Sequence, residues 1–144
     1  MKGGAVEIQT ETIQLSTKGH TDIHDVTATV QERLAATGFE QGHVVLFMPG
    51  STAGLTTIEY EPGLLKDIPE CLERIAPEDA DYHHHQTWGD HNGSAHVRSA
   101  LVGPSLVVPF AGGKLLLGTW QQIVLIDFDE RPRRRQLICQ FTGA

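Results

Sequence analysis

Short apolar segments separated by glycine-containing turns fill the second half of this chain and restrict the folds that it can adopt. We expect strands at Val97–Val102, Ser105–Pro109, Lys114–Leu117, Trp120–Phe128 and Arg134–Phe141. Gly103–Pro104 and Gly112–Gly113 have the composition of tight hairpin connections, which join antiparallel neighbours. The second half is therefore predicted to be a mainly antiparallel sheet.

The first half is expected to add three strands. Val6–Leu15 alternates roughly between apolar and polar residues, as a half-buried strand does. His43–Met48 is a short apolar run whose length and β-branching favour a strand buried on both faces. Leu55–Glu59 is the third expected strand. The sheet can therefore be antiparallel or mixed, depending on where these strands enter it.

An amphipathic helix is predicted at Ile23–Thr37, because apolar residues recur there at helical spacing. Asp22 is a plausible N-cap, with Thr21 as the competing candidate, and Gly38 suits the position just after the helix. His24 then lies in the first turn, where a solvent-facing or capping role is favoured over ligand binding.

A second helical region follows Pro62–Gly63 and ends at Pro77. Pro69 lies inside it, so one kinked helix and a turn followed by a helix are both compatible with the sequence. Asp67 is an N-cap candidate, with Glu70 completing a capping box, and it is also a candidate active-site carboxylate. Two helices with a mainly antiparallel or mixed sheet predict a single α+β domain over residues 1–144.

Composition limits the classes of function. The chain has 144 residues, of which 40% are apolar and 20% charged, as in ordinary globular domains. Its net charge of −7 argues against a general nucleic-acid binder. It has no apolar run of the ~18 residues that span a membrane, and no signal peptide is apparent. Cys71 and Cys139 lie in apolar patterns, so we expect buried thiols and a cytoplasmic protein with no membrane or nucleic-acid partner.

Five of the eight histidines lie in the stretch Asp81–Arg98, which its glycines mark as a loop. Imidazoles bind metals and transfer protons near neutral pH, although a polar loop can also carry histidines by chance. His84 and His96 are the leading candidate ligands and His91 is the third, with Glu59 or Asp90 as carboxylate ligands. Their spacing matches no local metal-binding motif.

Other candidates are distributed along the chain. The turn at Ser51–Gly54 can present hydroxyl and N–H groups to an anion, but such turns are common. Trp120 can stack on a heteroaromatic ring or belong to the core. In the run Arg131–Arg135, strand alternation would direct Arg133 and Arg135 to one side and Arg134 to the other. At most two of these three arginines can then share a pocket.

Together these segments resemble the YjbQ-like family, often described as secondary thiamine-phosphate synthases. The resemblance covers nearly the whole chain from Thr21 onward. The matching segments are Ser51–Glu59 (STAGLTTIE), Gly63–Asp67 (GLLKD), Tyr82 with His84, Asn92–Val97 (NGSAHV), Leu101–Ser105 (LVGPS), Gly113–Gln121 (GKLLLGTWQ) and Asp127–Arg135 (DFDERPRRR). Many members have a histidine before the Thr-Thr-Ala turn, where this chain has Gly50.

The resemblance implies a homotrimer with a metal-assisted activity that joins a hydroxymethylpyrimidine diphosphate to a thiazole phosphate and releases pyrophosphate. The alternative is a non-catalytic trimer that binds a metal or metabolite through the loop of His84 and His96. The cofactor would be a divalent cation, zinc or magnesium, and the ligand a small phosphorylated or heteroaromatic molecule. The catalytic candidates are Glu59, Asp67, Asp90 and His96; the substrate-binding candidates are Ser51, Thr52, Arg98, Trp120, Gln121 and Arg133; the metal-ligand candidates are His84, His96 and His91.

Overall fold

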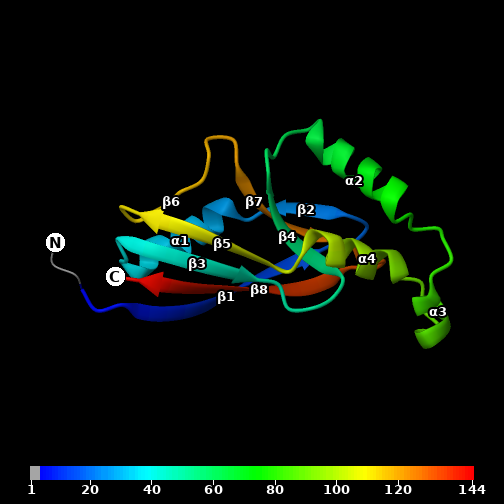
Figure 1. The fold of residues 1–144 in the computed structure, drawn as a ribbon, viewed down its shortest axis with the longest axis horizontal. Helices are drawn as coiled ribbons and strands as arrows, with labels where there is room; N and C mark the ends of the chain where they lie inside the picture. The colour runs from blue at the N-terminus through cyan, green and yellow to red at the C-terminus, as the bar shows by residue number, and fades with distance from the viewer. Residues whose placement is uncertain (1–3) are drawn as a thin grey trace.

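The structure is a computed structural model that describes residues 4–144 (Figure 1). Its strands are β1 (Glu7–Thr17), β2 (Asp22–Asp25), β3 (Gln41–Phe47), β4 (Ala53–Ile58), β5 (Ser105–Ala111), β6 (Lys114–Leu115), β7 (Gln122–Asp127) and β8 (Arg133–Gly143). Its helices are α1 (Thr27–Thr37), α2 (Leu64–Ile75), α3 (His83–Trp88) and α4 (Gly93–Val102). The architecture is α+β, as predicted, but the described part of the chain has four helices where the sequence predicted two.

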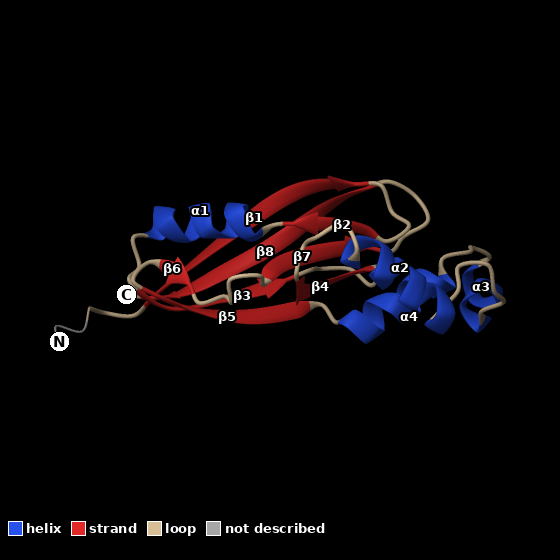
Figure 2. Cartoon of the chain, turned by 90° about the horizontal axis from the view of Figure 1, so that it is seen from above, coloured by secondary structure: helices blue, strands red, loops and turns tan. Residues whose placement is uncertain are grey.

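The strands form two antiparallel sheets. Sheet A has five strands in the order β1-β8-β3-β5-β6, and sheet B has three in the order β2-β7-β4. In sheet B, Ala53 of β4 lies opposite Asp127 of β7, and Ile58 lies opposite Gln122. Figure 2 shows α1 near the chain termini and the other three helices gathered at the opposite end of the molecule.

Sheet B has apolar residues on both of its faces. On one face, Leu55, Ile123 and Leu125 join the main core with the inner face of sheet A and helix α1. On the other face, Val124 and Ile126 pack with α2 and α4 in a second cluster. The continuous apolar run of β7 is therefore explained by burial on both faces. In contrast, β3 alternates between buried and exposed residues, so the expectation that it is buried on both faces is wrong within this chain.

The first predicted helix begins later than expected. Asp22–Asp25 forms strand β2, which pairs with β7, and α1 begins at Thr27, whose backbone N–H donates to Asp25 Oδ1 at 3.0 Å. Pairing with a buried strand outweighs the helical spacing here. His24 therefore lies on a strand, with Nε2 2.7 Å from Asp22 Oδ2. Gly38 ends the helix in the left-handed conformation, as predicted.

The histidine-rich stretch is helical, so the predicted loop and the predicted strand at Val97–Val102 are both wrong. Residues Ala95, Arg98, Ser99 and Val102 recur at helical spacing, and they form the buried or half-buried face of α4. The Ser99 hydroxyl donates to the Ala53 carbonyl of β4 at 2.6 Å. Gly103–Pro104 accordingly connects α4 to β5 instead of forming a hairpin.

Helix α2 is a single helix with Pro69 inside it. Glu61 caps this helix, because its carboxylate accepts from the backbone N–H groups of Gly63 and Leu64. Asp67 is in the first turn and its backbone N–H donates to the Gly63 carbonyl, so its proposed role as an N-cap is wrong. The prediction of buried thiols holds for Cys139 but not for Cys71, which is on the exposed side of α2. None of the helices within residues 4–144 is long and apolar enough to cross a membrane.

Candidate functional site

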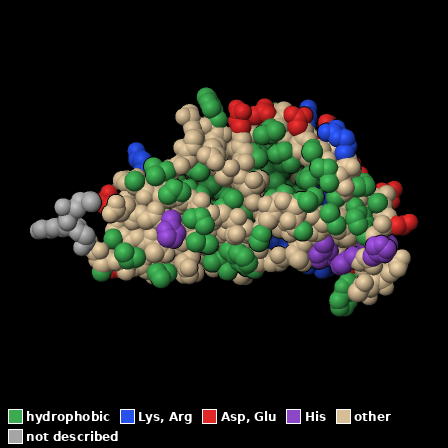
Figure 3. Space-filling view, viewed as in Figure 1, with side chains coloured by type: hydrophobic (Ala, Val, Ile, Leu, Met, Phe, Trp, Pro, Cys, Tyr) green, Lys and Arg blue, Asp and Glu red, His purple; other side chains and the backbone are tan. Residues whose placement is uncertain are grey.

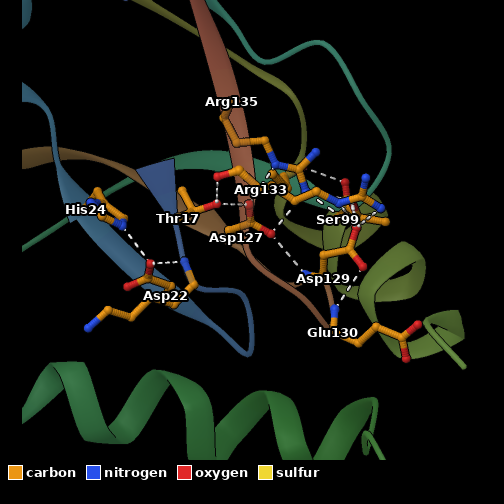
Figure 4. Close-up of polar contacts among 12 residues, drawn as sticks. Thr17, Asp22, His24, Ser99, Asp127, Asp129, Glu130, Arg133 and Arg135 are labelled. Atoms are coloured by element: carbon orange, nitrogen blue, oxygen red, sulfur yellow. Dashed lines mark hydrogen bonds and ion pairs between the residues drawn. The ribbon is translucent and has the colours of Figure 1, made fainter. Parts of the chain in front are cut away.

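Two buried carboxylates follow one another at the end of β7. Asp127 and Asp129 are both 0% exposed, and each is held by an arginine of β8 (Figure 4). Arg135 donates from Nε to Asp127 Oδ2 at 2.6 Å and from Nη2 to Oδ1 at 3.0 Å. Arg133 donates from Nε to Asp129 Oδ2 at 2.9 Å. The cluster therefore contains two carboxylates and two guanidinium groups, and its net charge is zero.

Hydroxyl and backbone N–H groups complete this cluster. Thr17 donates to Asp127 at 2.5 Å, and Thr52 donates to Asp129 at 3.0 Å while accepting from Arg135 Nη2 at 2.7 Å. Burial alone raises the pKa of Asp127, but hydrogen bonds from Arg135, Thr17 and a backbone N–H more than offset it, so the pKa is lowered. Burial likewise raises the pKa of Asp129, and its hydrogen bonds and Arg133 lower it by more. Both carboxylates are therefore ionised at neutral pH.

Strand alternation explains how the arginines reach these carboxylates. Arg133 and Arg135 point to the side of Asp127 and Asp129, whereas Arg134 is exposed and donates to Gln14 at 2.7 Å. This is the arrangement that the sequence predicted for the arginine run. Thr52 and Arg133, both predicted to bind substrate, are instead occupied mainly by Asp129.

His96 lies beside this cluster on α4. Its ring centroid is 4.3 Å from that of His84. Burial lowers the pKa of His96 and the neighbouring His84 lowers it further, whereas Asp129, Asp90 and the backbone of Ser51 offset part of the shift. His96 is therefore neutral near pH 7, and in that form an imidazole can accept a proton or bind a metal.

Asp90 lies next to the histidine pair. Nδ1 of His84 is 3.0 Å from Asp90 Oδ1. The two atoms are close but not aligned as donor and acceptor, so this buried nitrogen has no hydrogen-bond partner among residues 4–144. Asn92, with its amide oriented so that the NH₂ group faces Asp90, donates to the carboxylate at 3.1 Å. Of the candidate ligands, His84 therefore lies close to both His96 and Asp90.

The remaining histidines of the stretch have different environments. His83 is exposed, whereas His85 is half-buried and accepts from the Gly93 backbone N–H at 3.1 Å. His91 is exposed and its ring lies 5.3 Å from that of His85. Figure 3 shows histidines gathered over α3 and α4. Within residues 4–144, no group of three His, Cys, Asp or Glu side chains is arranged to hold a metal ion, so the set His84, His96 and His91 does not converge.

Arg98 has a structural role. It is 2% exposed, and it donates to the Ala76 carbonyl at 2.9 Å, the Thr21 hydroxyl at 2.9 Å and the Glu73 carboxylate at 2.7 Å. All three guanidinium nitrogens are engaged by protein atoms. Arg98 therefore ties α4 to α2 and to the turn before β2, and it does not present its charge to a phosphate.

Three of the remaining candidates lie far from His96. Glu59, Trp120 and Gln121 flank the Ile58–Gln122 end of sheet B, whereas His96 and Asp129 are near the Ala53–Asp127 end. Five residue steps at about 3.4 Å each separate these ends by roughly 17 Å. Trp120 is 72% exposed, so it is not a core residue, and Gln121 is bonded to Thr57. Asp67 is an exposed residue of α2.

One group near His96 was missed by the sequence reasoning. Gly50 adopts φ +119°, and a Cβ atom there would lie 3.3 Å from Nη1 of Arg135. No hydrogen bond to residues 4–144 engages that Nη1, although the Arg135 side chain is only 11% exposed. Ser51, which is exposed, follows directly. The signal that could have found the cluster is the pair Asp127 and Asp129 inside an apolar run, because buried carboxylates require cationic partners.

Comparisons with known proteins agree with the resemblance in the sequence. A family model described as "UPF0047 protein YjbQ-like" matches residues 11–144. A UPF0047 protein of Archaeoglobus fulgidus is 38% identical over 126 residues, which are 88% of this chain and 95% of that protein. A UPF0047 protein of Methanothermobacter thermautotrophicus is 35% identical over 144 residues, 99% of each chain.

Solved structures show the same fold. A YbjQ-like protein of unknown function from Sulfolobus solfataricus superposes with a TM-score of 0.91 at 27% identity, covering 97% of this chain and 100% of that one. A hypothetical protein from Aeropyrum pernix gives a TM-score of 0.88 at 32% identity, covering 94% and 99%. The chain therefore belongs to the UPF0047, or YjbQ-like, family.

Proposed function

We propose that this protein is a transferase of the thiamine-phosphate synthase type and that its site surrounds the Gly50–Thr52 turn. One observation carries the proposal: a cationic group, Nη1 of Arg135, lies beside Gly50 of this turn, and a neutral imidazole, His96, lies beside Ser51. The guanidinium group can bind the phosphate groups of a substrate. A neutral imidazole can take part in proton transfer near neutral pH.

The reaction forms a carbon–nitrogen bond from the thiazole nitrogen to the methylene carbon of the pyrimidine, and it breaks the bond from that carbon to the pyrophosphate oxygen. The electron pair of the broken bond leaves on pyrophosphate. The main requirement is therefore to stabilise negative charge on the leaving group. Arg135 is suited to this role, since Asp127 fixes its orientation through two hydrogen bonds while Nη1 stays available. The exposed Ser51 hydroxyl is a second donor on the same turn.

As a separate part of this proposal, the protein binds a divalent cation, zinc or magnesium. His84, His96 and Asp90 are close together, and a neutral His96 is the form that binds a metal. They do not form a complete ligand set within residues 4–144, so no step of the reaction is assigned to a metal here. Metal analysis of untagged protein tests this part of the proposal. If no transition metal is bound and zinc does not bind at micromolar concentration, zinc is rejected as the cofactor.

A coupled assay for thiamine phosphate tests the activity. His96→Gln should reduce the rate by about 100-fold, the scale expected when a positioned catalytic group is lost, whereas His83→Gln, an exposed neighbour, should leave it unchanged. Absence of turnover in the wild-type protein would reject this transferase activity. Equal rates in the wild type and His96→Gln would remove His96 from the site.

We also propose that the protein is a homotrimer, assembled through the outer face of sheet A. Apolar side chains are exposed there, among them Phe47 at 42% and Val107 at 64%. Trp120 lies too far from His96 to stack on the same substrate within one chain, so a neighbouring copy would have to supply it. Light scattering should give three times the 15.8 kDa mass of the chain, and Val107→Asp should reduce it. A monomeric wild type would reject the proposal.

A further inference from the structure

Two tryptophans are exposed to a similar degree, but they lie in different places. Trp88 is 73% exposed and ends α3, four residues after His84, whereas Trp120 is 72% exposed and lies at the far end of sheet B. We propose that Trp88 is a binding residue of the site at the Gly50–Thr52 turn and that its indole stacks on a flat heteroaromatic ring, the pyrimidine of the proposed substrate. The inference rests on the proposed function, because it adds recognition of the ring to the same site.

Helix geometry places Trp88 next to His84. Helix α3 covers His83–Trp88, and its last turn is closed by the Gly89 backbone N–H, which donates to the His85 carbonyl at 2.8 Å. Residues four apart on a helix lie on the same face, with Cβ atoms roughly 5–6 Å apart. Helical side chains also lean toward the N-terminus of their helix, so the indole is directed toward the turn that carries His84.

His84 connects Trp88 to the rest of the site. Its ring centroid is 4.3 Å from that of His96, and His96 lies beside the Gly50–Thr52 turn. Nη1 of Arg135 lies against the same turn. The ring and the phosphate groups of one ligand would then have separate partners within a single chain, the indole and the guanidinium group.

The space beside Trp88 is open. Gly89 follows it in the left-handed conformation with φ +67°, and a Cβ atom there would meet no atom of residues 4–144 within 4 Å, apart from the adjoining residues. Because the indole is exposed and the backbone after it is uncovered on that side, a planar ring can approach without displacing protein atoms.

An unpartnered nitrogen is an independent indication of a ligand. Nδ1 of His84 is buried and has no hydrogen-bond partner among residues 4–144. Buried polar atoms in proteins normally have one, and exceptions call for an explanation such as a catalytic role or a bound water or ion. Since Asp90 Oδ1 is 3.0 Å away but misaligned, a small movement of Asp90 when a ligand binds would complete this bond.

The neighbouring residues favour a polar aromatic ring. An indole offers a broad flat face on which nucleic-acid bases and other heteroaromatic rings stack. Asp90 is 37% exposed, so its carboxylate can accept from an amino group at the edge of such a ring. The sequence from His83 to Asn92 contains no arginine or lysine, so the phosphate groups of the ligand find their cationic partner at Arg135 instead.

Fluorescence of single-tryptophan variants tests the assignment. The chain has two tryptophans, so Trp120→Phe retains only Trp88, and Trp88→Phe retains only Trp120. We expect hydroxymethylpyrimidine diphosphate to quench Trp88 saturably, because a stacked heteroaromatic ring quenches indole emission, and to leave Trp120 unchanged. Pyrophosphate, which has the charged groups but no ring, should quench neither.

Calorimetric titration gives the affinities. Trp88→Ala should weaken binding of hydroxymethylpyrimidine diphosphate about tenfold, and Trp88→Phe should weaken it less, since it keeps an aromatic face. The affinity for pyrophosphate should be the same in both variants as in the wild type. Tyr60→Ala, which removes another exposed aromatic side chain at the far end of sheet B, is the matched control and should bind both ligands normally.

Three results would overturn the inference: no binding of the pyrimidine diphosphate at millimolar concentration, equal affinity in Trp88→Ala and wild type, or quenching of Trp120 in place of Trp88. The last result would assign the ring contact to a neighbouring copy. Turnover separates this inference from the proposed function. Thiamine phosphate formation with the same KM in Trp88→Ala and wild type would keep the transferase and reject Trp88, whereas binding through Trp88 without turnover would do the reverse.

Discussion

Both ends of sheet B carry residues that the sequence marked as candidates, but only one end organises them. At the Ala53–Asp127 end, two fully buried carboxylates bind two arginines, and His96 lies alongside. At the Ile58–Gln122 end, Glu59 and Trp120 are exposed. Residue type alone therefore does not identify a site; the packing around the residues decides which of them act together.

The difference follows from what covers each end. Helix α4 packs against β4 near Ala53, and β8 brings alternate arginines toward the end of β7. Charges in such a place must be paired, because burial without a partner costs several kcal/mol. At the other end the chain enters turns that solvent surrounds, so polar groups there need no partners.

The largest effect is expected for Asp127→Ala. The substitution leaves Arg135 largely buried without its carboxylate, which should lower the free energy of unfolding by about 3–5 kcal/mol. Urea denaturation measures this. Glu59→Gln, at the other end of sheet B, should leave the midpoint unchanged. If the two variants unfold at the same urea concentration, the two ends of sheet B do not differ in their contribution to stability.

A smaller loss is expected for Arg98→Ala, which tests whether the structured end extends into α4. Arg98 makes three charge-assisted or backbone hydrogen bonds, and its partner Glu73 is half exposed, so about 3 kcal/mol of stability should be lost. Arg74→Ala, on the exposed side of α2, is the matched control. A stable Arg98→Ala protein with impaired phosphate binding would restore the role that the sequence predicted for Arg98.

The sequence predicted much of the fold because periodicity reports burial. The alternation of β1, the apolar run of β7 and the Gly38 helix end are all visible in it. It failed where partners far along the chain decide, since β2 is a strand because β7 lies beside it. It also failed at α4, because the glycines at the two ends of this helix indicate a loop and a strand. The helical spacing of Ala95, Arg98, Ser99 and Val102 was present but outweighed by those glycines.

The candidate site was predictable only in part. His84, His96 and Asp90 come together as expected, since they flank one short connection. Arg135 was expected on the same side as Arg133, but its ion pair with Asp127 was not predicted, because it depends on the register between two sheets. The separation of Trp120 from His96 is likewise a property of strand direction, which no local motif contains.

Introducing at position 50 the histidine that the sequence resemblance leads one to expect should have a smaller effect than either charge deletion. Gly50→His places a side chain at φ +119° and next to Arg135 Nη1, so about 1–2 kcal/mol of stability should be lost. The affinity for pyrophosphate, measured by titration, should also fall, because the new side chain covers Arg135 Nη1. Gly38→Ala is the control, as φ is +73° there with no atom within 4 Å. Pyrophosphate binding that is unchanged by Gly50→His would remove Arg135 Nη1 from the site.

The smallest effect is expected for the pH dependence of stability, compared between the wild type and a variant without His96. Because burial and His84 hold the pKa of His96 below its ordinary value of about 6.5, the unfolded chain binds a proton at that residue before the folded chain does. Stability should therefore fall as pH decreases below about 6.5, until the lowered pKa is reached. The His96→Gln variant lacks this titrating group. As the pH is lowered from about 7.5 to 5.5, the unfolding free energy of the wild type should therefore fall relative to that of the variant. Parallel curves over that range would mean that His96 titrates as it does in the unfolded chain, and that burial and His84 do not lower its pKa.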